Sequence, residues 1–260
     1  EKQTIEFLHA ENDHDDFEKE ILLPHRNSQH GPELAVADVN NDGLQDVFFC
    51  NAYKQPSVLY LQTSPGVFKK KNGTGFTTDK NKEDVGAHFF DYNNDGFMDL
   101  YVASGGNEFE DQTNSYKHRL YKNDGKGNFT NDYRSLPDFA VSGKEVTSAD
   151  FDGDGDLDLF VGGRLTPAKY PFAPRSYLLI NNNGVFEDKT KELAKQEFSD
   201  EVSRQIIVNI IRQGMSLAYS NAYELCEDKI AELPDGERIL ELSNVIQPIM
   251  VHMYCIKSIK

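Results

Sequence analysis

Short apolar stretches alternate with clusters of Asp, Asn and Gly along residues 34–190. Three of these stretches, residues 34–37, 87–90 and 146–149, lie directly before an Asp-rich loop. Each loop is followed at once by a second apolar run, which begins at Val47, Leu100 or Leu159. Short runs of this kind, separated by turn residues, predict antiparallel β-strands joined by hairpins.

The pattern continues beyond each loop with a further strand, a Gly turn and a last short strand. These segments cover residues 58–61 and 66–68, then 119–121 and 127–129, then 177–180 and 184–186. The three loops begin 53 and then 59 residues apart, somewhat more than the about 40 to 50 residues of common propeller blades. One such sheet cannot bury both faces alone, whereas repeated sheets stacked around an axis can. The sequence therefore predicts an all-β fold, a partial or incomplete β-propeller.

The Asp-rich loops, residues 38–46, 91–99 and 150–158, share one spacing of oxygen-bearing side chains. Asp or Asn occupies positions 1, 3, 5 and 9, and Gly occupies position 6, where it permits a tight turn. Calcium is a hard cation that takes about six to eight oxygen ligands. We therefore predict about three Ca²⁺ sites, each made by four side chains and the backbone carbonyl at position 7. The predicted ligands are Asp38, Asn40, Asp42, Leu44 and Asp46; Asp91, Asn93, Asp95, Phe97 and Asp99; and Asp150, Asp152, Asp154, Asp156 and Asp158.

An EF-hand begins with a similar sequence but needs a Glu at position 12 and a helix on each side. Position 12 is Phe49, Val102 or Val161 in the three loops, and each lies in the following apolar run. The loops are therefore interpreted as hairpin sites that are closed by the acid at position 9. A single loop of this kind could be a simple hydrophilic turn, but three copies in register favour metal binding.

The overall composition is acidic, with 43 Asp and Glu against 27 Lys and Arg in 260 residues and a formal net charge of −16. This balance argues against nucleic acid as a partner, because a phosphate backbone attracts clustered Lys and Arg. No apolar run reaches the about 20 residues of a membrane-spanning helix, so no transmembrane segment is predicted. Cys50, Cys226 and Cys255 are too scattered for a disulfide framework or a paired zinc site, and we expect ordinary buried thiols.

The loops resemble the FG-GAP/VCBS repeats of integrin α-subunit-type propellers, in which a D-x-[DN]-x-DG-x-x-D hairpin loop binds calcium. Residues 22–25, 31–35, 104–110, 160–164 and 173–178 are similar to one branch, the bacterial VCBS-repeat proteins of the ASPIC/UnbV-associated type. The resemblance covers residues 1–198 and implies a calcium-bearing propeller with an extracellular, periplasmic or cell-surface location. The chain begins with Glu1 rather than Met, so a signal segment is expected to have been removed or left out.

Two features depart from that family pattern. A closed propeller has about four to eight blades, but only three repeats carry a loop, although residues 1–30 can supply a further strand. An open sheet edge would favour self-association. The repeat pattern ends near residue 194, and Ile206, Ile207, Ile210 and Ile211 then recur at helical spacing. We therefore predict β-propeller-type repeats over residues 1–198 and a small α-helical C-terminal segment over residues 199–260, which is either a packed appendage or a partner-binding element.

The sequence contains none of the common catalytic motifs, neither a G-x-S-x-G elbow nor HExxH nor a phosphate-binding Gly loop. Carboxylate pairs of the glycosidase kind stay possible, since acidic residues are abundant. Arg164 and Arg175 could clamp an anionic ligand, but anchoring a loop through backbone carbonyls is the favoured reading.

Three functions remain open at this point. The first is a non-catalytic binding or adhesion module for an unknown protein or glycan ligand, with calcium bracing the blades. The second is the scaffold of a secreted polysaccharide-active enzyme, which an aromatic-lined cleft with paired acids would favour. The third is a structural unit that self-associates through the open sheet edge or the C-terminal helices.

Overall fold

The computed structural model describes residues 5–192 except residues 22, 24, 30, 74, 111, 112, 171 and 173. Apart from Glu192, these residues belong to the first of two compact units, Glu1–Lys191; the second is Glu192–Lys260. The predicted helices of residues 199–260 lie outside the described residues, as do Cys226 and Cys255. The predicted division at residue 198 therefore stays a prediction.

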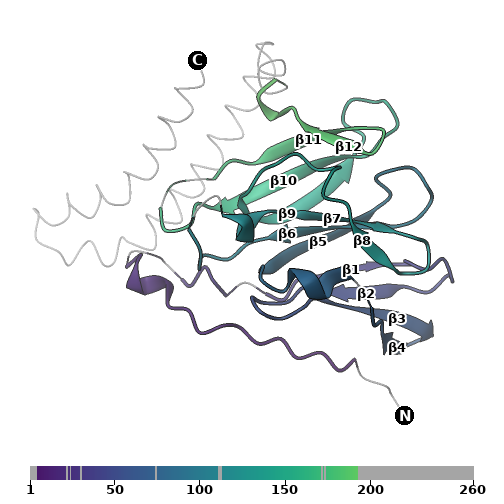
Figure 1. Cartoon of the computed structure of the whole chain (residues 1–260), viewed down its shortest axis with the longest axis horizontal. Helices are drawn as coiled ribbons and strands as arrows, with labels where there is room; N and C mark the ends of the chain where they lie inside the picture. The colour runs from purple at the N-terminus through teal and green to yellow at the C-terminus, as the bar shows by residue number, and fades with distance from the viewer. Residues whose placement is uncertain are drawn as a thin grey trace, which may run out of the picture. The chain divides into compact units, whose positions relative to one another are not determined.

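The described residues form three antiparallel sheets of four strands, each with its strands in chain order (Figure 1). The first sheet contains β1 (Leu34–Ala37), β2 (Asp46–Phe49), β3 (Val58–Ser64) and β4 (Val67–Lys70). The second contains β5 (Asp84–Phe90), β6 (Asp99–Ser104), β7 (Arg119–Asn123) and β8 (Phe129–Asn131). The third contains β9 (Ser142–Ala149), β10 (Asp158–Leu165), β11 (Tyr177–Asn182) and β12 (Val185–Asp188). Three short 3₁₀ helices complete the described elements: η1 (Asp16–Glu18), η2 (Gly75–Asp79) and η3 (Asn114–Tyr116).

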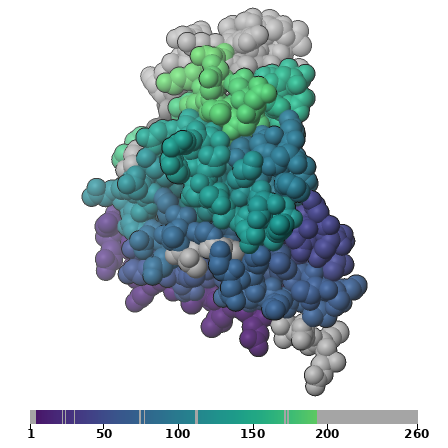
Figure 2. Space-filling view, turned by 45° about the vertical axis from the view of Figure 1, so that its right-hand side comes forward, coloured from purple at the N-terminus to yellow at the C-terminus, as the bar shows by residue number. Residues whose placement is uncertain are grey.

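The three sheets stack face to face with two apolar layers between them, and they form successive bands in Figure 2. Successive side chains of a strand point to opposite faces of its sheet. In β6, Leu100 therefore packs with Phe48 of the first sheet, whereas Tyr101 packs with Leu159 of the third. This architecture confirms the all-β, propeller-like prediction, and every predicted repeat strand is found close to its expected bounds.

The outer face of the third sheet differs from the equivalent faces of the other two. Phe48 pairs with Leu59, Tyr101 with Leu120, and Phe160 with Leu178, so Phe48, Tyr101 and Phe160 occupy equivalent positions. Phe48 and Tyr101 are 0% exposed because the next sheet covers them, whereas Phe160 is 47% exposed. The same side chain position is thus a core position in two repeats and a surface position in the third.

The N-terminal segment forms no strand within its described residues, so the expected additional strand from residues 1–30 is not found there. The segment instead runs across the first sheet without pairing its backbone in a ladder. The Phe7 ring stacks on Phe49 with 4.5 Å between ring centroids, and the Tyr60 hydroxyl donates a hydrogen bond to the backbone carbonyl of Glu6. Aromatic packing holds this segment in place. The apolar pattern of the sequence fits such packing as well as it fits a paired strand, so it could not distinguish the two.

Candidate metal-binding loops

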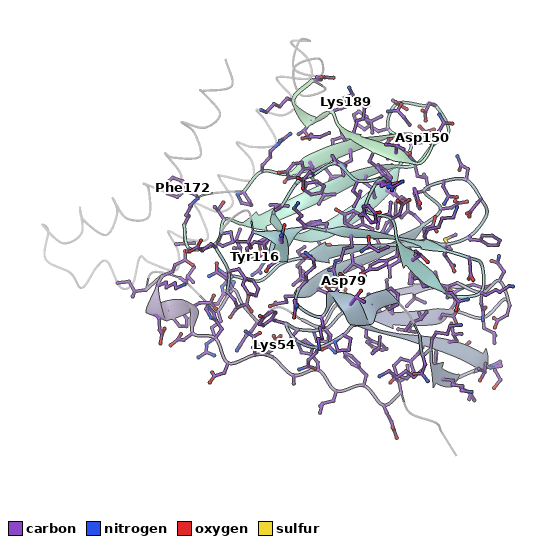
Figure 3. All side chains as sticks on the ribbon, viewed as in Figure 1. Lys54, Asp79, Tyr116, Asp150, Phe172 and Lys189 are labelled. Carbon is purple, nitrogen blue, oxygen red and sulfur yellow. The ribbon has the colours of Figure 1, made fainter. Side chains whose placement is uncertain are left out.

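The three Asp-rich loops connect β1 to β2, β5 to β6 and β9 to β10, so they lie at the same end of their sheets. Figure 3 shows Asp150 at this end, and Phe172 and Tyr116 lie toward the other end. The hairpin interpretation is therefore confirmed, since each loop joins two antiparallel strands rather than two helices.

The first Asp of each loop folds the loop around its own carboxylate. Asp38 accepts hydrogen bonds from the backbone N–H of Asp42 (3.1 Å) and of Gly43 (2.7 Å). Asp91 repeats both contacts, with the N–H groups of positions 5 and 6 at 3.1 Å and 2.8 Å. Asp150 accepts from the N–H groups of positions 4 and 6, at 2.8 Å and 3.1 Å. Because two amides bind one carboxylate, the loop backbone curls toward that side chain.

Positions 3 and 5 continue the same curl with shorter-range contacts. The side-chain oxygen at position 3 accepts from the N–H of position 5, at 3.1 Å for Asn40 and Asn93 and 3.3 Å for Asp152. The carboxylate at position 5 accepts from the N–H of position 7, at 2.9 Å for Asp42, 3.1 Å for Asp95 and 2.9 Å for Asp154. These Asx-type turns hold alternate side chains on the inside of the loop.

Two positions in each loop have positive φ angles. Position 6 is Gly43, Gly96 or Gly155, with φ between 84° and 96°, and nothing lies within 4 Å of where their Cβ atoms would be. The backbone conformation, rather than crowding, therefore requires glycine there. Position 4 is also left-handed, with φ of 57° at Asn41, 55° at Asn94 and 80° at Gly153. Asn and Gly are the residues that adopt this conformation most readily. Their presence at position 4 of all three loops therefore predicts a left-handed residue there, which the spacing of the ligands alone does not.

The carboxylates converge most closely in the second and third loops. Asp91, Asp95 and Asp99 each offer an oxygen within 4.8 Å of the others, and Asp150, Asp152 and Asp158 do the same. Within the described residues, the first loop forms no such group of three acids. All-oxygen clusters of this size suit a hard divalent cation, so the residues present in the second and third loops fit one. The ligand roles of all the predicted residues, including the carbonyls of Leu44, Phe97 and Asp156, stay predictions.

The Asp at position 9 fastens each loop to its own sheet. Asp46 accepts from the N–H of Val39 at 3.0 Å and from that of Gln62 in β3 at 2.8 Å. Asp158 accepts from the N–H groups of Phe151 and Asn181, both at 2.7 Å. Asp99 accepts from the N–H of Asn123 at 2.7 Å and from that of Tyr92. All three carboxylates are buried, with exposed fractions of 0% or 1%, so this residue has a structural role besides its predicted role as a ligand.

The surroundings of Asp99 and Asp46 raise the pKa of both carboxyl groups when no cation is bound. Burial, followed by the negative charges of Asp95 and Asp91, raises the pKa of Asp99 to about 7. Burial and the charges of Asp42 and Asp38 raise the pKa of Asp46 in the same direction. A bound divalent cation would supply the positive charge that these sites otherwise lack.

Asn side chains at the ends of β7 and β11 connect each loop to the preceding repeat. The Asn123 amide donates to the backbone carbonyls of Val39 (2.8 Å) and Met98 (2.9 Å), which belong to two different loops. The Asn181 amide does the same with Tyr92 (2.7 Å) and Leu157 (3.1 Å). Sequence reasoning missed this contact between repeats, although an Asn recurs at the same place in the second and third repeats.

The other end of the sheets contains a hollow of about 450 Å³. Its lining includes Tyr170 and Phe172, which are 48% and 59% exposed, together with Glu20, Asn107 and Arg164. Most of its polar groups are already engaged within the chain. Glu20 accepts from the Asn107 amide and from the backbone N–H of Tyr170, both at 2.7 Å.

Both arginines of the third repeat hold parts of the chain together. Arg164 donates to the backbone carbonyl of Asn27 at 3.2 Å and to its side-chain oxygen at 3.0 Å. Arg175 pairs with Asp188 at 2.6 Å and lies over the Tyr177 ring. The expected anchoring role of Arg164 is thus confirmed, whereas Arg175 anchors through a carboxylate rather than a carbonyl.

Successive four-stranded meanders, each with an Asp-rich hairpin between its first and second strands, define a propeller-type repeat protein. Residues 38–102 and 110–161 match the family model of the FG-GAP-like repeat, and the first match begins at the first Asp of the first loop. Two segments of the chain are therefore similar to the FG-GAP-like repeat. The narrower resemblance to ASPIC/UnbV-associated proteins stays a prediction.

A solved structure similar to this chain is that of an Agrocybe aegerita lectin, described for specific recognition of non-reducing terminal N-acetylglucosamine. The two are 23% identical with a TM-score of 0.41, over 61% of this chain and 37% of the lectin chain. That likeness is too weak to bear on function. A search of curated proteins gave no match. None of the helices in the described part of the chain is long and apolar enough to cross a membrane.

Proposed function

We propose that this chain is a non-catalytic binding or adhesion module in which Ca²⁺, held by the hairpin loops, braces the stacked sheets. The convergence of three carboxylates in the second loop, and again in the third, carries this proposal. Because Asp99 also binds the backbone of β7, an ion held in the second loop would fix that loop relative to its sheet. The Asn181 contact with Tyr92 would pass the same restraint to the third sheet.

Electrostatics supports a stabilising rather than a switching role for the ions. Each loop gathers at least three Asp residues, and like charges at such short separations repel one another. Bound calcium removes this repulsion in the folded state only, so it shifts the folding equilibrium toward the folded chain. At a free calcium concentration 100 times the dissociation constant, one site would add about 2.7 kcal/mol to the free energy of unfolding.

Thermal unfolding with calcium and with excess chelator tests the proposal directly. We expect a higher melting temperature in calcium for the natural chain, and much less dependence on calcium in a D38N/D91N/D150N variant. Asn keeps the size of Asp and one acceptor oxygen, so this variant removes charge with little change of shape. Magnesium at the same concentration serves as the control ion. Identical melting curves of the natural chain in calcium and in chelator would overturn the proposal.

The hollow lined by Tyr170 and Phe172 contains no carboxylate pair of the glycosidase kind among its described residues. Glycosidases of the usual kind place two carboxylates on either side of the scissile bond. Glu20 is the single acidic residue among the described residues that line this hollow, and both of its oxygens already accept hydrogen bonds. A glycan array probed with and without calcium would identify the ligand class. Calcium-dependent binding without product supports the module, whereas release of product would establish an enzyme.

Self-association is a second candidate function, and the exposed Phe160 favours it. An equivalent position is fully buried under the next sheet in both other repeats, so this face resembles a sheet-packing surface. The proposed occupant is the same face of a second copy, because the N-terminal segment already packs on Phe49 of the first sheet. Sedimentation velocity should show dimers that a Phe160→Glu variant loses and a Phe172→Glu variant keeps. A monomer at all accessible concentrations would contradict this candidate.

The proposed location is extracellular, periplasmic or at the cell surface, as the family resemblance implies. Calcium sites of extracellular modules have dissociation constants of about 10⁻⁴ to 10⁻³ M. Sites of that affinity fill only where calcium is abundant. A dissociation constant near 10⁻⁷ M in a calcium titration would instead fit a cytosolic sensor and contradict this location.

A further inference from the structure

A second hollow, of about 510 Å³, lies where β5 and β7 of the second sheet begin. Its lining combines two lysines, Lys82 and Lys117, with the ring of Tyr133 and the side chains of Leu136 and Phe139. These residues precede β5 and β7 or follow β8, so they lie at the end of the sheets opposite the Asp-rich loops. We call this feature the lysine hollow.

Lys82 is a partly buried cation that has no carboxylate partner in the described part of the chain. Its ammonium group donates to the backbone carbonyl of Asn114, which is neutral. Burial, and next the charge of Arg119, lower the pKa of Lys82 to about 8. An ammonium group has three donors, and a charge that leaves water is usually paired. Lys82 therefore has donors left for an anion that would serve as its counter-ion.

Lys117 meets Lys82 at the same carbonyl group. The backbone N–H of Lys117 donates to the Asn114 carbonyl at 3.3 Å, and this carbonyl also accepts from the Lys82 ammonium group. The Lys117 side chain pairs with Asp138 at 2.5 Å, and the two side chains are 41% and 81% exposed. An exposed ion pair adds only about 0–1 kcal/mol, so a ligand anion can replace Asp138 at little cost. The hollow thus offers the ammonium donors of two neighbouring lysines.

The carboxylates near Lys82 are bound by other groups. Asp84 forms a buried ion pair with Arg119, and Asp79, labelled in Figure 3, accepts a hydrogen bond from the Tyr121 hydroxyl at 2.5 Å. Their charges oppose the fall in the pKa of Lys82 but do not outweigh it. Because both acids among the described residues that line the hollow already have partners, the arrangement fits the binding of a ligand better than acid–base catalysis.

Tyr133 gives the hollow an exposed aromatic ring. Its exposed fraction is 75%, and the guanidinium group of Arg134 lies over the ring, 5.7 Å from its centroid. Leu136 and Phe139 pack against the apolar core between the second and third sheets, so this part of the lining is held in place. Sites for small organic ligands usually combine such apolar side chains with a few polar groups that fix the orientation of the ligand.

A ligand that fits this lining carries an anionic group for the lysines and a ring with an apolar face for Tyr133. We propose that the lysine hollow binds an acidic saccharide, whose carboxylate or sulfate group pairs with Lys82 and whose ring packs on Tyr133. This inference rests on the proposed function as a binding module, and it narrows the glycan ligand to the acidic ones. The chain has a net charge of −16, so the lysines are needed to attract such a ligand to this surface.

Protection of Lys82 from acetylation tests the site on the natural chain. Acetic anhydride modifies unprotonated amines, and peptide mass spectrometry gives the labelling of each lysine. Trigalacturonate or a sulfated galactose trisaccharide, at about ten times its dissociation constant, should lower the labelling of Lys82 about tenfold. Neutral galactotriose should leave it unchanged, and the exposed Lys80 is the internal control. Equal labelling of Lys82 with acidic and neutral trisaccharides would overturn the proposal, as would protection by a triglutamate peptide alone, which would assign the hollow to acidic peptides.

Matched variants separate this site from the module as a whole. Lys82→Gln should lower the affinity for the acidic trisaccharides about tenfold in calorimetry, because it removes a charge-assisted hydrogen bond, whereas Lys80→Gln should retain the full affinity. Tyr133→Ala should also weaken binding and Tyr133→Phe should not, and the exposure of this ring means that both variants fold. Glycan binding that Lys82→Gln and Tyr133→Ala leave unchanged would contradict this site and leave the binding module standing. Binding that depends on Lys82, in a chain whose melting curve ignores calcium, would contradict the calcium brace and leave this site standing.

Discussion

The two ends of the stacked sheets are built in different ways. At one end, three loops repeat the same hydrogen bonds within short segments of the chain, from the Asp at position 1 to the Asp at position 9. At the other end, residues far apart in the sequence meet once. Asp16 there binds the backbone of Ser28 and the side chain of Asn107, 91 residues further along.

One end is therefore held by hydrogen bonds within single loops, and the other by contacts between residues that are far apart in the sequence. A loop that hydrogen-bonds to itself can form wherever its sequence recurs, so the repeated end requires only the motif. The opposite end forms only after the sheets have stacked, because its contacts join the N-terminal segment to the second and third repeats. We therefore expect the effects of substitutions on stability to depend on calcium and pH differently at the two ends.

The largest expected effect is at the buried Asp of the second loop. Asp99→Ala removes the acceptor for the buried N–H groups of Asn123 and Tyr92, and each unpaired buried donor costs about 1–3 kcal/mol. We expect a loss of about 3–4 kcal/mol in the free energy of unfolding by urea denaturation, and this loss should persist in excess chelator. Asp91→Asn, which keeps an acceptor, should lose stability mainly when calcium is present. A loss in Asp99→Ala that disappears in excess chelator would show that Asp99 acts only as a ligand.

The next largest effect is a pH dependence at the opposite end, where His118 is buried. Its Nδ1 is 2.7 Å from the Tyr101 hydroxyl and its Nε2 is 3.0 Å from the Val141 carbonyl. Burial lowers the pKa of His118 from its ordinary value of 6.5 to about 4, and the charges of Arg119 and Lys82 act in the same direction. Between these values the unfolded chain binds a proton that the folded chain does not. Stability is therefore lost as the pH falls through this window.

Comparison with a His118→Gln variant isolates this contribution. The stability of the natural chain should fall relative to the variant by about 1.4 kcal/mol per pH unit between pH 6.5 and 4. Denaturant titrations at several pH values in excess chelator give both curves without interference from metal binding. Parallel curves would mean that His118 is protonated in the folded chain as readily as in the unfolded one.

The sequence was sufficient to predict the repeated end because its information is local. Residues 38–46 contain the donors, acceptors and glycine that the first loop needs, and the same holds for its two copies. The strands followed from the apolar stretches on either side. The contact of Asn123 with Val39 was not predicted, since it joins two repeats whose register depends on the stacking of the sheets.

A third prediction concerns this contact between repeats. Asn123 is 1% exposed, and its amide holds the carbonyls of Val39 and Met98. Asn123→Ala should cost about 2 kcal/mol, because it leaves the buried carbonyl of Val39 and the partly buried carbonyl of Met98 without this donor. Asn128→Ala serves as the control, since Asn128 is exposed and its side chain contacts only Asp124 among the described residues. Chemical denaturation should show the larger loss for Asn123, and equal losses would mean that the contact adds nothing.

The buried acids of the opposite end could not be assigned from the sequence. Glu83 and Glu108 resemble many other acids of an acidic chain, and only the folded structure shows that they are buried together. The segment 104–110 did stand out as similar to one family branch, but the resemblance gave no reason for its glycines. The structure supplies that reason, because a side chain at Gly106 would displace both carboxyl groups.

The smallest predicted effect measures this crowding. Gly106 has φ of 90° and Gly66, in the turn between β3 and β4, has φ of 79°, so Ala is strained at both positions. A Cβ atom would meet the carboxyl groups of Glu108 and Glu83 at Gly106, whereas nothing lies within 4 Å at Gly66. Gly106→Ala should therefore cost about 1 kcal/mol more than Gly66→Ala, since both share the backbone penalty and only one has the collision.

Calcium sharpens this last comparison. If Glu83 and Glu108 bind a calcium ion, displacing their carboxyl groups should also lower the affinity for that ion. The difference in melting temperature between the two Ala variants should then grow when calcium replaces chelator. If the two acids share only a proton, the difference should be the same in both conditions. Thermal unfolding of the two variants in each condition distinguishes these outcomes. A Gly106→Ala chain as stable as Gly66→Ala in both would show that the carboxyl groups move aside freely, which a site built from fixed ligands does not allow.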